Sequence, residues 1–284
     1  MNIYISGSNG LIGSALKQSL LADGHTVKGL GRDFSQPINF EGIDAVIHLA
    51  GENIAEGRWS KTKKDLIKSS RVDNTQKLSN QIYNSEHKPN VFISASAIGF
   101  YGDTGSDLIT ENSPAGKGFL PEVSIDWEAA TKPVENAGVR VIHLRTGIVL
   151  SKKGGALKKM LPPFLLGGGG ILGSGKQYMS WISIDDMIGA IKFLVNDSSL
   201  KGPFNLTAPK PVNNKDFTKI LGKVIKRPTI LPLPGFIAKL IFGEMAEALL
   251  LSGSNVIPEK LLDSGYIFKH SELREALKDL LTKK

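Results

Sequence analysis

Three glycines, Gly7, Gly10 and Gly13, constrain the fold of this chain more than any other feature of its sequence. They form a G-x-x-G-x-x-G loop that follows an apolar run at residues 2–6 and opens a helical pattern at residues 11–23. Glycine lets a strand turn sharply into a helix, and it lets backbone N–H groups approach an anion at the positive helix N-terminus. The order of strand, glycine loop and helix therefore predicts a βαβ unit with a phosphate-binding turn.

Short β-branched runs alternate with longer helical patterns through the first 150 residues. The predicted strands are residues 2–6, 25–30, 44–49, 91–95 and 139–144, and the predicted helices are residues 11–23, 60–84 and 122–137. Near-continuous apolar strands that alternate with helices indicate a parallel sheet covered on both faces. Because such crossovers are right-handed, we expect an α/β fold built on a doubly wound parallel (Rossmann) sheet.

After Arg145 the glycines and prolines of loops become frequent, and residues 179–184 then resume as a strand. Asp185 and Asp186 follow, and either carboxylate is expected to cap a helix over residues 187–195. Further prolines divide the remainder into short helices, of which the last is predicted over residues 271–281.

These patterns predict two parts. Residues 1–150 are expected to form an NAD(P)-binding Rossmann domain, which residues 179–207 complete. Residues 151–178 and 208–284 are expected to form a smaller C-terminal lobe that holds a substrate. A chain of 284 residues is long enough for one large domain or two intimate ones.

Composition excludes several classes of protein. The absence of cysteine rules out disulfides, thiolate metal sites and a cysteine nucleophile. Lys and Arg number 35 against 27 Asp and Glu, but no long basic run or interleaved aromatic motif supports nucleic-acid binding. No apolar window reaches the roughly 18 residues of a membrane span, and no basic stretch precedes the apolar N-terminus. We therefore expect a cytoplasmic protein with no nucleic-acid or membrane partner, whose net charge of +8 suits an anionic ligand.

The sequence does not satisfy the other catalytic and ligand-binding motifs considered. GILGSGKQ at residues 170–177 is close to a P-loop, but Gln177 stands where that motif needs Ser or Thr, and no strand or helix flanks it. No G-x-S-x-G elbow is present, and the five histidines show no metal-ligand spacing. His48 and His143 lie within apolar strands and are expected to be core residues with satisfied hydrogen bonds.

The residue after the second strand bears on which dinucleotide binds. Arg32 lies 19 residues after Gly13, where a side chain that reads the adenosine ribose belongs. Arginine there suits a 2′-phosphate, whereas an acidic residue suits the free 2′-hydroxyl of NAD. Asp33 follows immediately, so the pattern favours NADP(H) over NAD(H) without excluding NAD(H).

With the glycine loop, the segments DAVIHLAG (44–51) and ISASAIGFYG (93–102) make the chain resemble the extended short-chain dehydrogenase/reductases, the NAD-dependent epimerase/dehydratase group. Four further segments are similar to its sugar-nucleotide-epimerase-like subgroup: RWSKTKKDLIKSSRVDNT, DWEAA, GVRVIHLRTGIVL and SWISIDD. Residues 253–268 resemble the closing domain of unknown function in that subgroup. The resemblance covers essentially the whole chain and implies an NADP-type cofactor.

The resemblance also implies roles for individual residues. The glycine loop and its neighbours would contact the pyrophosphate, the end of the third strand would line adenine and ribose, and two arginines would supply cations. These predicted cofactor residues are Gly7, Ser8, Gly10, Leu11, Ile12, Gly13, Arg32, Leu49, Ala50, Gly51 and Arg71. Ser96 matches the serine that hydrogen-bonds a substrate hydroxyl or carbonyl.

One departure from the superfamily concerns its chemistry. Its enzymes use Tyr-x-x-x-Lys, in which the tyrosine moves the proton and the lysine lowers the tyrosine's pKa. Counting back from Arg145 by the family spacing reaches Ser124 instead of the lysine, and Leu120 instead of the tyrosine. Both are expected on one helix face toward the nicotinamide, and neither can do that work.

Tyr101, Glu122 and Asp126 lie nearby and are candidate replacements, and Tyr101 joins Ser96 as a predicted catalytic residue. The resulting hypothesis is an NADP(H)-binding oxidoreductase or nucleotide-sugar epimerase-like enzyme whose substrate is a small molecule, such as a nucleotide sugar or a carbonyl compound. The alternative, which the missing pair favours, is a non-catalytic NADP(H)-binding redox sensor or regulatory protein. The sequence indicates neither the substrate nor the oligomeric state.

Overall fold

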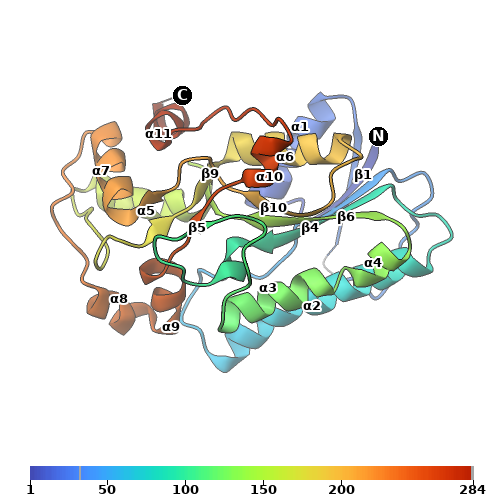
Figure 1. The fold of residues 1–284 in the computed structure, drawn as a ribbon, viewed down its shortest axis with the longest axis horizontal. Coiled ribbons are helices and arrows are strands. Elements are labelled where there is room, and N and C mark those ends of the chain that lie inside the picture. The colour runs from blue at the N-terminus through green and yellow to red at the C-terminus, as the bar shows by residue number, and fades with distance from the viewer. Residues whose placement is uncertain (32, 283–284) are drawn as a thin grey trace.

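The computed structural model describes residues 1–31 and 33–282. Within them, six parallel strands form the central sheet in the order β10-β6-β4-β3-β1-β2 (Figure 1). These strands are β1 (Asn2–Ser6), β2 (Thr26–Leu30), β3 (Ala45–His48), β4 (Val91–Ala97), β6 (Arg140–Thr146) and β10 (Gly202–Leu206). The predicted doubly wound parallel α/β fold is confirmed.

Helices cover both faces of the sheet (Figure 1). One face carries α1 (Leu11–Ala22) and α6 (Ile184–Asn196), whose buried side chains include Leu16 and Ile191. The other face carries α2 (Lys61–Asn84), α3 (Phe119–Ala129) and α4 (Lys132–Asn136). Burial of apolar side chains on both faces explains why the strands are apolar throughout instead of alternating.

The strand order locates the candidate site. The chain starts in β1 inside the sheet, runs outward to β2, and then crosses back to β3 on the other side of β1. The connections that leave the carboxyl ends of β1 and β3 therefore diverge and open a crevice, which is where parallel sheets of this kind bind ligands. The glycine loop follows β1 directly at this point.

The remaining elements are short and pack around the sheet. The strands pair as β7 (Ile148–Leu150) with β9 (Trp181–Ser183), β8 (Tyr178–Met179) with β11 (Val212–Asn213), and β5 (Leu108–Ile109) with β12 (Asn255–Val256). The helices are α5 (Gly155–Leu165), α7 (Asn214–Ile225), α8 (Gly235–Phe242), α9 (Glu244–Ala246), α10 (Glu259–Asp263) and α11 (Leu273–Thr282), with a 3₁₀ turn at Ile98–Tyr101 and a π-helical turn at Glu247–Leu251. Trp181, Phe217 and Leu277 form a second core among them. The exact division into a Rossmann domain and a lobe stays a prediction.

The helix predicted over residues 122–137 is instead two helices. The first, α3, begins at Phe119 and ends at Ala129. The second, α4, begins at Lys132 and has Pro133 in its first turn. Proline has no N–H to donate to the preceding turn, so it starts a helix more readily than it continues one.

Two predictions around α6 are wrong. Residues 179–184 do not form one strand, because β8 and β9 are separated at Ser180, whose hydroxyl donates to the Ser254 carbonyl and accepts from the Val256 N–H. Neither Asp185 nor Asp186 caps α6. The cap is Ser183, whose Oγ accepts a hydrogen bond from the Asp186 N–H at 3.1 Å. None of the helices described is both long and apolar enough to cross a membrane.

Candidate functional site

Two of the three loop glycines are required by close backbone contacts. Gly7 has φ of +73°, and a Cβ there would lie 2.9 Å from the backbone nitrogen of Ala50. A Cβ on Gly13 would lie only 2.2 Å from the Gly7 carbonyl oxygen. Real Cβ atoms do not approach backbone so closely, so any side chain at either position would displace the loop.

Gly10 differs from both of these glycines. Its φ of −75° is accessible to every residue, and its Cβ would meet only the Gly7 carbonyl oxygen, at 3.2 Å. Gly10 is the N-cap of α1, where it offers no side-chain hydrogen bond, and the first turn holds no acidic residue. The N–H groups of that turn are therefore uncapped by the protein's side chains, and the bare Cα leaves room for an anion to reach them. This cradle fits a pyrophosphate.

The other predicted loop residues offer backbone rather than side chains. The Ser8 hydroxyl lies against β2, where a Cβ on Gly29 would be 2.6 Å from it. The Leu11 side chain packs under Gly154, and Ile12 packs against the core beneath α1. All three hold the loop in place, and their N–H groups are the atoms that can face a ligand.

Arg71 packs against the turn at residues 49–51, which is predicted to line the adenine and ribose. Leu49 and Ala50 back directly onto Gly7, and a Cβ on Gly51 would lie 3.4 Å from the Arg71 guanidinium carbon. Arg71 donates to the carbonyls of Glu52 and Ile67, at 2.9 and 3.1 Å. Burial lowers the pKa of Arg71 to about 10. These bonds make Arg71 a brace for the turn at Gly51, and its predicted role as a cation for the cofactor stays a prediction.

Arg32 lies outside the described residues, so its assignment to the 2′-phosphate also stays a prediction. Its neighbour Asp33 accepts hydrogen bonds from the N–H and the hydroxyl of Ser35, each at 2.9 Å. These bonds lower the pKa of Asp33. The Asp33 carboxylate thus holds a local turn.

Buried polar side chains connected by hydrogen bonds lie at the carboxyl ends of three neighbouring strands. We call this set the buried network, and its members are Ser96, Tyr101, Glu128, Arg145 and Asn205. The register of the sheet places Ser96 of β4 and Asn205 of β10 on either side of Arg145 of β6. Residues 49 and 60 positions apart in the sequence therefore meet at the carboxyl edge of the sheet.

Glu128 is at the centre of the buried network. Arg145 donates to it from Nε to Oε1 at 2.8 Å and from Nη2 to Oε2 at 2.9 Å, and Ser96 Oγ donates to Oε1 at 2.7 Å. The side chains of Glu128 and Arg145 are only 12% and 6% exposed. Burial opposes the charged form of Glu128, but the hydrogen bonds from Arg145 and Ser96 and the charges of His143 and Arg145 together outweigh it, so the pKa of this carboxyl is lowered.

Tyr101 is built into the same network. Its hydroxyl donates to Asn205 Oδ1 at 2.7 Å and accepts from Arg145 Nη1 at 3.0 Å, and the residue is 1% exposed. Burial raises the pKa of Tyr101, although Arg145 acts in the opposite direction. The structure thus connects the two predicted catalytic residues, Ser96 and Tyr101, through Glu128 and Arg145. Both side chains are buried, Ser96 being 4% exposed, and the catalytic role of each stays a prediction.

Leu120 and Ser124 lie on α3, as the spacing predicts. The Ser124 hydroxyl donates to the Leu120 carbonyl at 2.9 Å, and Leu120 packs in an apolar cluster with Trp59 and Met245. The other acid/base candidates on α3 point elsewhere, because Asp126 pairs with Lys68 at the surface and Glu122 is exposed.

Sequence reasoning missed Glu128, Asn205 and a third buried polar residue, Glu111. The Glu111 carboxylate accepts from the backbone N–H of Asn205 at 2.9 Å and from that of Lys260 at 3.3 Å, and its burial raises its pKa. A signal existed for Glu128 alone: it lies four residues after Ser124, and so on the same helix face.

A groove of about 920 Å³ adjoins the glycine loop. It lies between α1, α6 and residues 151–154, and Gly10 and Leu11 form part of its wall. Its volume lies within the range of about 300–1,000 Å³ that is typical of small-molecule sites. The groove therefore offers space next to the pyrophosphate cradle.

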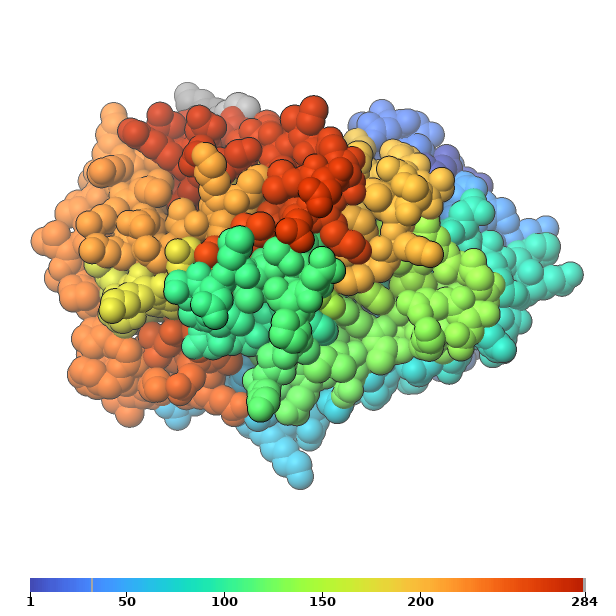
Figure 2. Space-filling model, in the orientation of Figure 1, coloured from blue at the N-terminus to red at the C-terminus, as the bar shows by residue number. Residues whose placement is uncertain are grey.

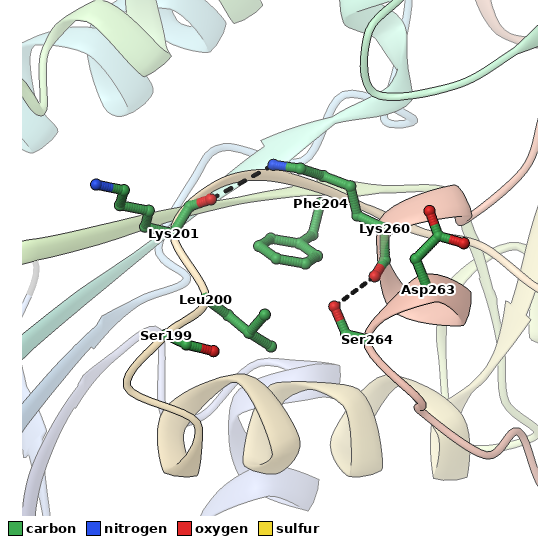
Figure 3. Close-up of a pocket in the computed structure, with 7 residues that line it drawn as sticks. All are labelled: Ser199, Leu200, Lys201, Phe204, Lys260, Asp263 and Ser264. Atoms are coloured by element: carbon green, nitrogen blue, oxygen red, sulfur yellow. Dashed lines mark hydrogen bonds between the residues drawn. The ribbon is translucent and has the colours of Figure 1, made fainter.

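A smaller cavity of about 270 Å³ lies at the start of β10 (Figure 3). One of its two lysines, Lys260, extends over the Phe204 ring and donates to the carbonyls of Lys201 and Pro203. These contacts fasten α10 to the sheet.

Asp185, His270 and Asp279 have ligand atoms within 4.8 Å of one another, a spacing that could hold a metal ion. Lys269 already pairs with both carboxylates, and His270 Nε2 contacts Asp279 Oδ2 at 3.2 Å. The lysine ammonium therefore supplies the positive charge that this cluster needs.

Comparison with known proteins identifies the family. The model of the NAD dependent epimerase/dehydratase family matches residues 3–207, and that of a domain of unknown function, DUF1731, matches residues 233–280. This chain belongs to the NAD-dependent epimerase/dehydratase family. The resemblance predicted from its motifs is confirmed, and the family description confirms a nicotinamide dinucleotide at the level of the family.

Individual relatives of this family member match over nearly the whole chain. An epimerase family protein of Mycobacterium tuberculosis is 42% identical, over 97% of this chain and 96% of the relative. The human epimerase family protein SDR39U1, crystallised with NADPH, superposes with a TM-score of 0.94 at 32% identity, and all of both chains is covered. A nucleoside-diphosphate sugar epimerase from Corynebacterium glutamicum superposes at 0.81 and 36% identity, with this chain covering 58% of its length.

Proposed function

We propose that this protein is an NADP(H)-binding enzyme of its family that acts on a small hydroxyl or carbonyl compound, with a nucleotide sugar as the first class to test. The observation that carries the proposal is the cradle at the N-terminus of α1, where Gly7, Gly10 and Gly13 leave uncapped N–H groups beside Leu49 and Ala50. The human relative that was crystallised with NADPH supports the choice of cofactor. The cytoplasmic location stays a prediction.

Each part of the cradle has a physical task. The first turn of α1 binds the pyrophosphate through backbone N–H groups and the positive end of the helix dipole. The bare Cα of Gly10 permits that approach, and Arg71 holds the turn at Gly51. When bound, the nicotinamide ring supplies or takes up a hydride.

The family pattern assigns Ser96 to the substrate, and the hydrogen bond from Ser96 to Glu128 limits the contacts that its hydroxyl can make. Its hydroxyl proton is committed to Glu128 at 2.7 Å, so the lone pairs of Oγ remain for a ligand. In this state Ser96 accepts a hydrogen bond from a substrate hydroxyl, and it can donate to a carbonyl only by releasing Glu128. The proposal is therefore that Ser96 orients the alcohol form of a substrate.

The second candidate function is a non-catalytic NADP(H)-binding sensor. One observation favours it: Leu120 is apolar and the Ser124 hydroxyl is bonded to its own helix, so neither position offers a proton carrier. Steady-state oxidation of NADPH with a panel of nucleotide sugars and small carbonyls separates the two. Turnover with any of them supports the enzyme, whereas uniform inactivity with tight NADPH binding supports the sensor.

The proposal is tested first by Gly10→Val. Valine fits the backbone at φ of −75° but places two methyl groups where the pyrophosphate approaches. We expect a fall in NADPH affinity of at least about 100-fold, with a loss of folding stability of only about 1 kcal/mol, as for an ordinary N-cap change. Isothermal titration and urea denaturation measure the two. Normal NADPH binding by this folded variant would place the cofactor elsewhere.

The choice between NADPH and NADH is tested by Arg32→Ala. If Arg32 pairs with the 2′-phosphate, its loss weakens NADPH by about 1.5–3 kcal/mol, the value of a charge-assisted hydrogen bond, and leaves NADH nearly unchanged. Titration of both cofactors against the variant decides this, since equal losses would remove the assignment.

A further inference from the structure

Large apolar side chains are exposed together at one end of the molecule. Of the fifteen exposed large apolar residues among those described, seven lie in three short segments. They are Leu165, Leu166, Ile230, Leu231, Phe236, Leu240 and Ile241. Leu166 is 88% exposed, Ile230 75% and Phe236 73%, which is far more exposure than packing within this chain explains.

These segments adjoin one another. Leu166 follows α5, and the glycine run after it lies beside residues 231–233, where the N–H of Leu233 donates to the Ile171 carbonyl at 2.9 Å. Helix α8 begins two residues later, at Gly235. Figure 1 shows α5, α7 and α8 at the end of the molecule away from the N-terminus, and Figure 2 shows their yellow and orange atoms forming that end of the surface. We call this surface the apolar end.

The segments that form the apolar end also carry the net excess of positive charge. Residues 151–178 and 208–243, which contain α5, α7 and α8, hold twelve Lys and Arg against a single Asp. The whole chain has a net charge of only +8, so the rest of the molecule is net negative. Exposed cations on α5, on α7 and just after α7 include Lys158, Lys219, Lys223 and Arg227. The elements at this end of the molecule thus carry both exposed apolar side chains and exposed cations.

We propose that the apolar end docks this protein peripherally on an anionic lipid surface. Apolar side chains that enter the headgroup boundary, with cations that contact anionic headgroups, are the two attractions that hold peripheral proteins on such membranes. A second copy of this chain fits less well, because two equally basic surfaces would repel each other. The sequence alone predicts no membrane partner. Neither net charge nor the length of apolar windows shows which side chains are exposed, so neither could indicate this surface. This inference does not depend on the proposed function.

The test is co-sedimentation of the full chain with vesicles of phosphatidylcholine alone and of phosphatidylcholine with about 30% phosphatidylserine. We expect binding to the anionic vesicles only, weakening as salt is raised. The double variant Phe236→Ser/Leu240→Ser should lower partitioning by roughly tenfold or more, because two buried apolar side chains are lost. Lys219→Glu/Arg227→Glu should lower it by a similar factor, through the loss of two cations at the surface.

The chain offers matched controls. Ile267 is 88% exposed but lies outside the apolar end, and Lys77 is an exposed lysine on α2, so Ile267→Ser and Lys77→Glu should bind vesicles as the parent does. All variants should keep the parent's NADPH affinity, which separates this test from that of the proposed function. Three results would overturn the inference: no binding to anionic vesicles at low salt, equal losses in the controls, or a dimer in sedimentation velocity that Phe236→Ser/Leu240→Ser abolishes without any vesicle binding.

Discussion

Replacing Glu128 by Gln tests whether the buried network holds the carboxyl edge of the sheet. Glutamine keeps the shape of the side chain but removes the negative charge that Arg145 meets with two hydrogen bonds, at 2.8 and 2.9 Å. The Arg145 guanidinium, whose side chain is only 6% exposed, would then remain buried without a counter-ion. An unpaired buried charge is far more costly than a missing surface pair.

The expected magnitude follows from this burial. Removing one partner of a buried ion pair costs about 3–5 kcal/mol, against 0–1 kcal/mol for an exposed pair. In a chain of this size each kcal/mol lowers the melting temperature by about 2 °C, so we expect a decrease of about 6–10 °C. Urea denaturation followed by tryptophan fluorescence measures the free energy of unfolding, and Trp127 on α3 reports directly on this region.

The matched control is Glu122→Gln on the same helix. Glu122 is exposed, so its loss should change the free energy of unfolding by less than about 1 kcal/mol. Arg145→Met combined with Glu128→Gln should cost clearly less than the sum of the two single variants, because no unpaired charge then remains. A cost below about 1 kcal/mol for Glu128→Gln, equal to that of the control, would refute the reasoning.

The pairing of Glu128 with Arg145 also predicts how the free energy of unfolding changes with pH. Arg145, His143 and Ser96 together hold the pKa of folded Glu128 below that of an unfolded glutamate, so the unfolded chain takes up more protons as the pH falls. The stabilisation is therefore complete above the pKa of the unfolded residue and is lost as the pH decreases through the pKa of the folded one. Glu128→Gln should lack this part of the acid sensitivity.

Three other substitutions have separate expected outcomes. Tyr101→Phe removes the donor to Asn205 Oδ1 and one acceptor of Arg145, and should cost about 1–3 kcal/mol in urea denaturation with NADPH affinity unchanged; lost turnover with full stability would instead favour proton transfer by this hydroxyl. Arg71→Met removes the brace behind Gly51 and should weaken NADPH by about tenfold in titration calorimetry, whereas unchanged affinity would make that brace irrelevant to binding. Burial lowers the pKa of His48 from 6.5 to about 4, so stability should rise with pH across that interval by about 3 kcal/mol, a dependence that His48→Gln should remove in acid titrations.

The features predicted correctly from the sequence are those that a few adjacent residues determine. The strand before Gly7 and the helix that begins after Gly10 are each signalled within a dozen residues, and their order predicts the phosphate-binding turn. Local signals also explain the errors. The apolar pattern over residues 122–137 is continuous enough to suggest one helix, and the proline at 133 is what ends it.

From the sequence, His48 is predicted to be a core residue with satisfied hydrogen bonds, but only one of its two ring nitrogens has a hydrogen-bond partner in the described part of the chain. The residue is fully buried, and its Nδ1 lies 2.5 Å from the Ser6 hydroxyl, as a core histidine should. Its Nε2 is buried with no hydrogen-bond partner among the described residues. Sequence pattern places a side chain in a core but does not show whether each of its polar atoms finds a partner there.

The buried network could not be predicted, because sheet register assembles it. Ser96, Arg145 and Asn205 become neighbours only once β4, β6 and β10 are paired at one particular register. Glu111 reaches Asn205 from a loop 94 residues away in sequence. No periodicity or local motif encodes such contacts, whereas a family resemblance can mark single members, as it did for Ser96.

The place of Ser96 in this network connects the chemistry of the site to its stability. The hydroxyl that the family pattern assigns to the substrate is also the third hydrogen bond to the Glu128 carboxylate. A substrate carbonyl must compete with a charged acceptor at 2.7 Å for that proton, and a charged acceptor binds it more strongly than a neutral one. A substrate hydroxyl meets no such competition, because it donates to the lone pairs that remain on Oγ. If the protein is an enzyme, Glu128→Gln should therefore ease binding of carbonyl compounds relative to alcohols while it destabilises the fold. In a sensor, the same substitution changes stability alone.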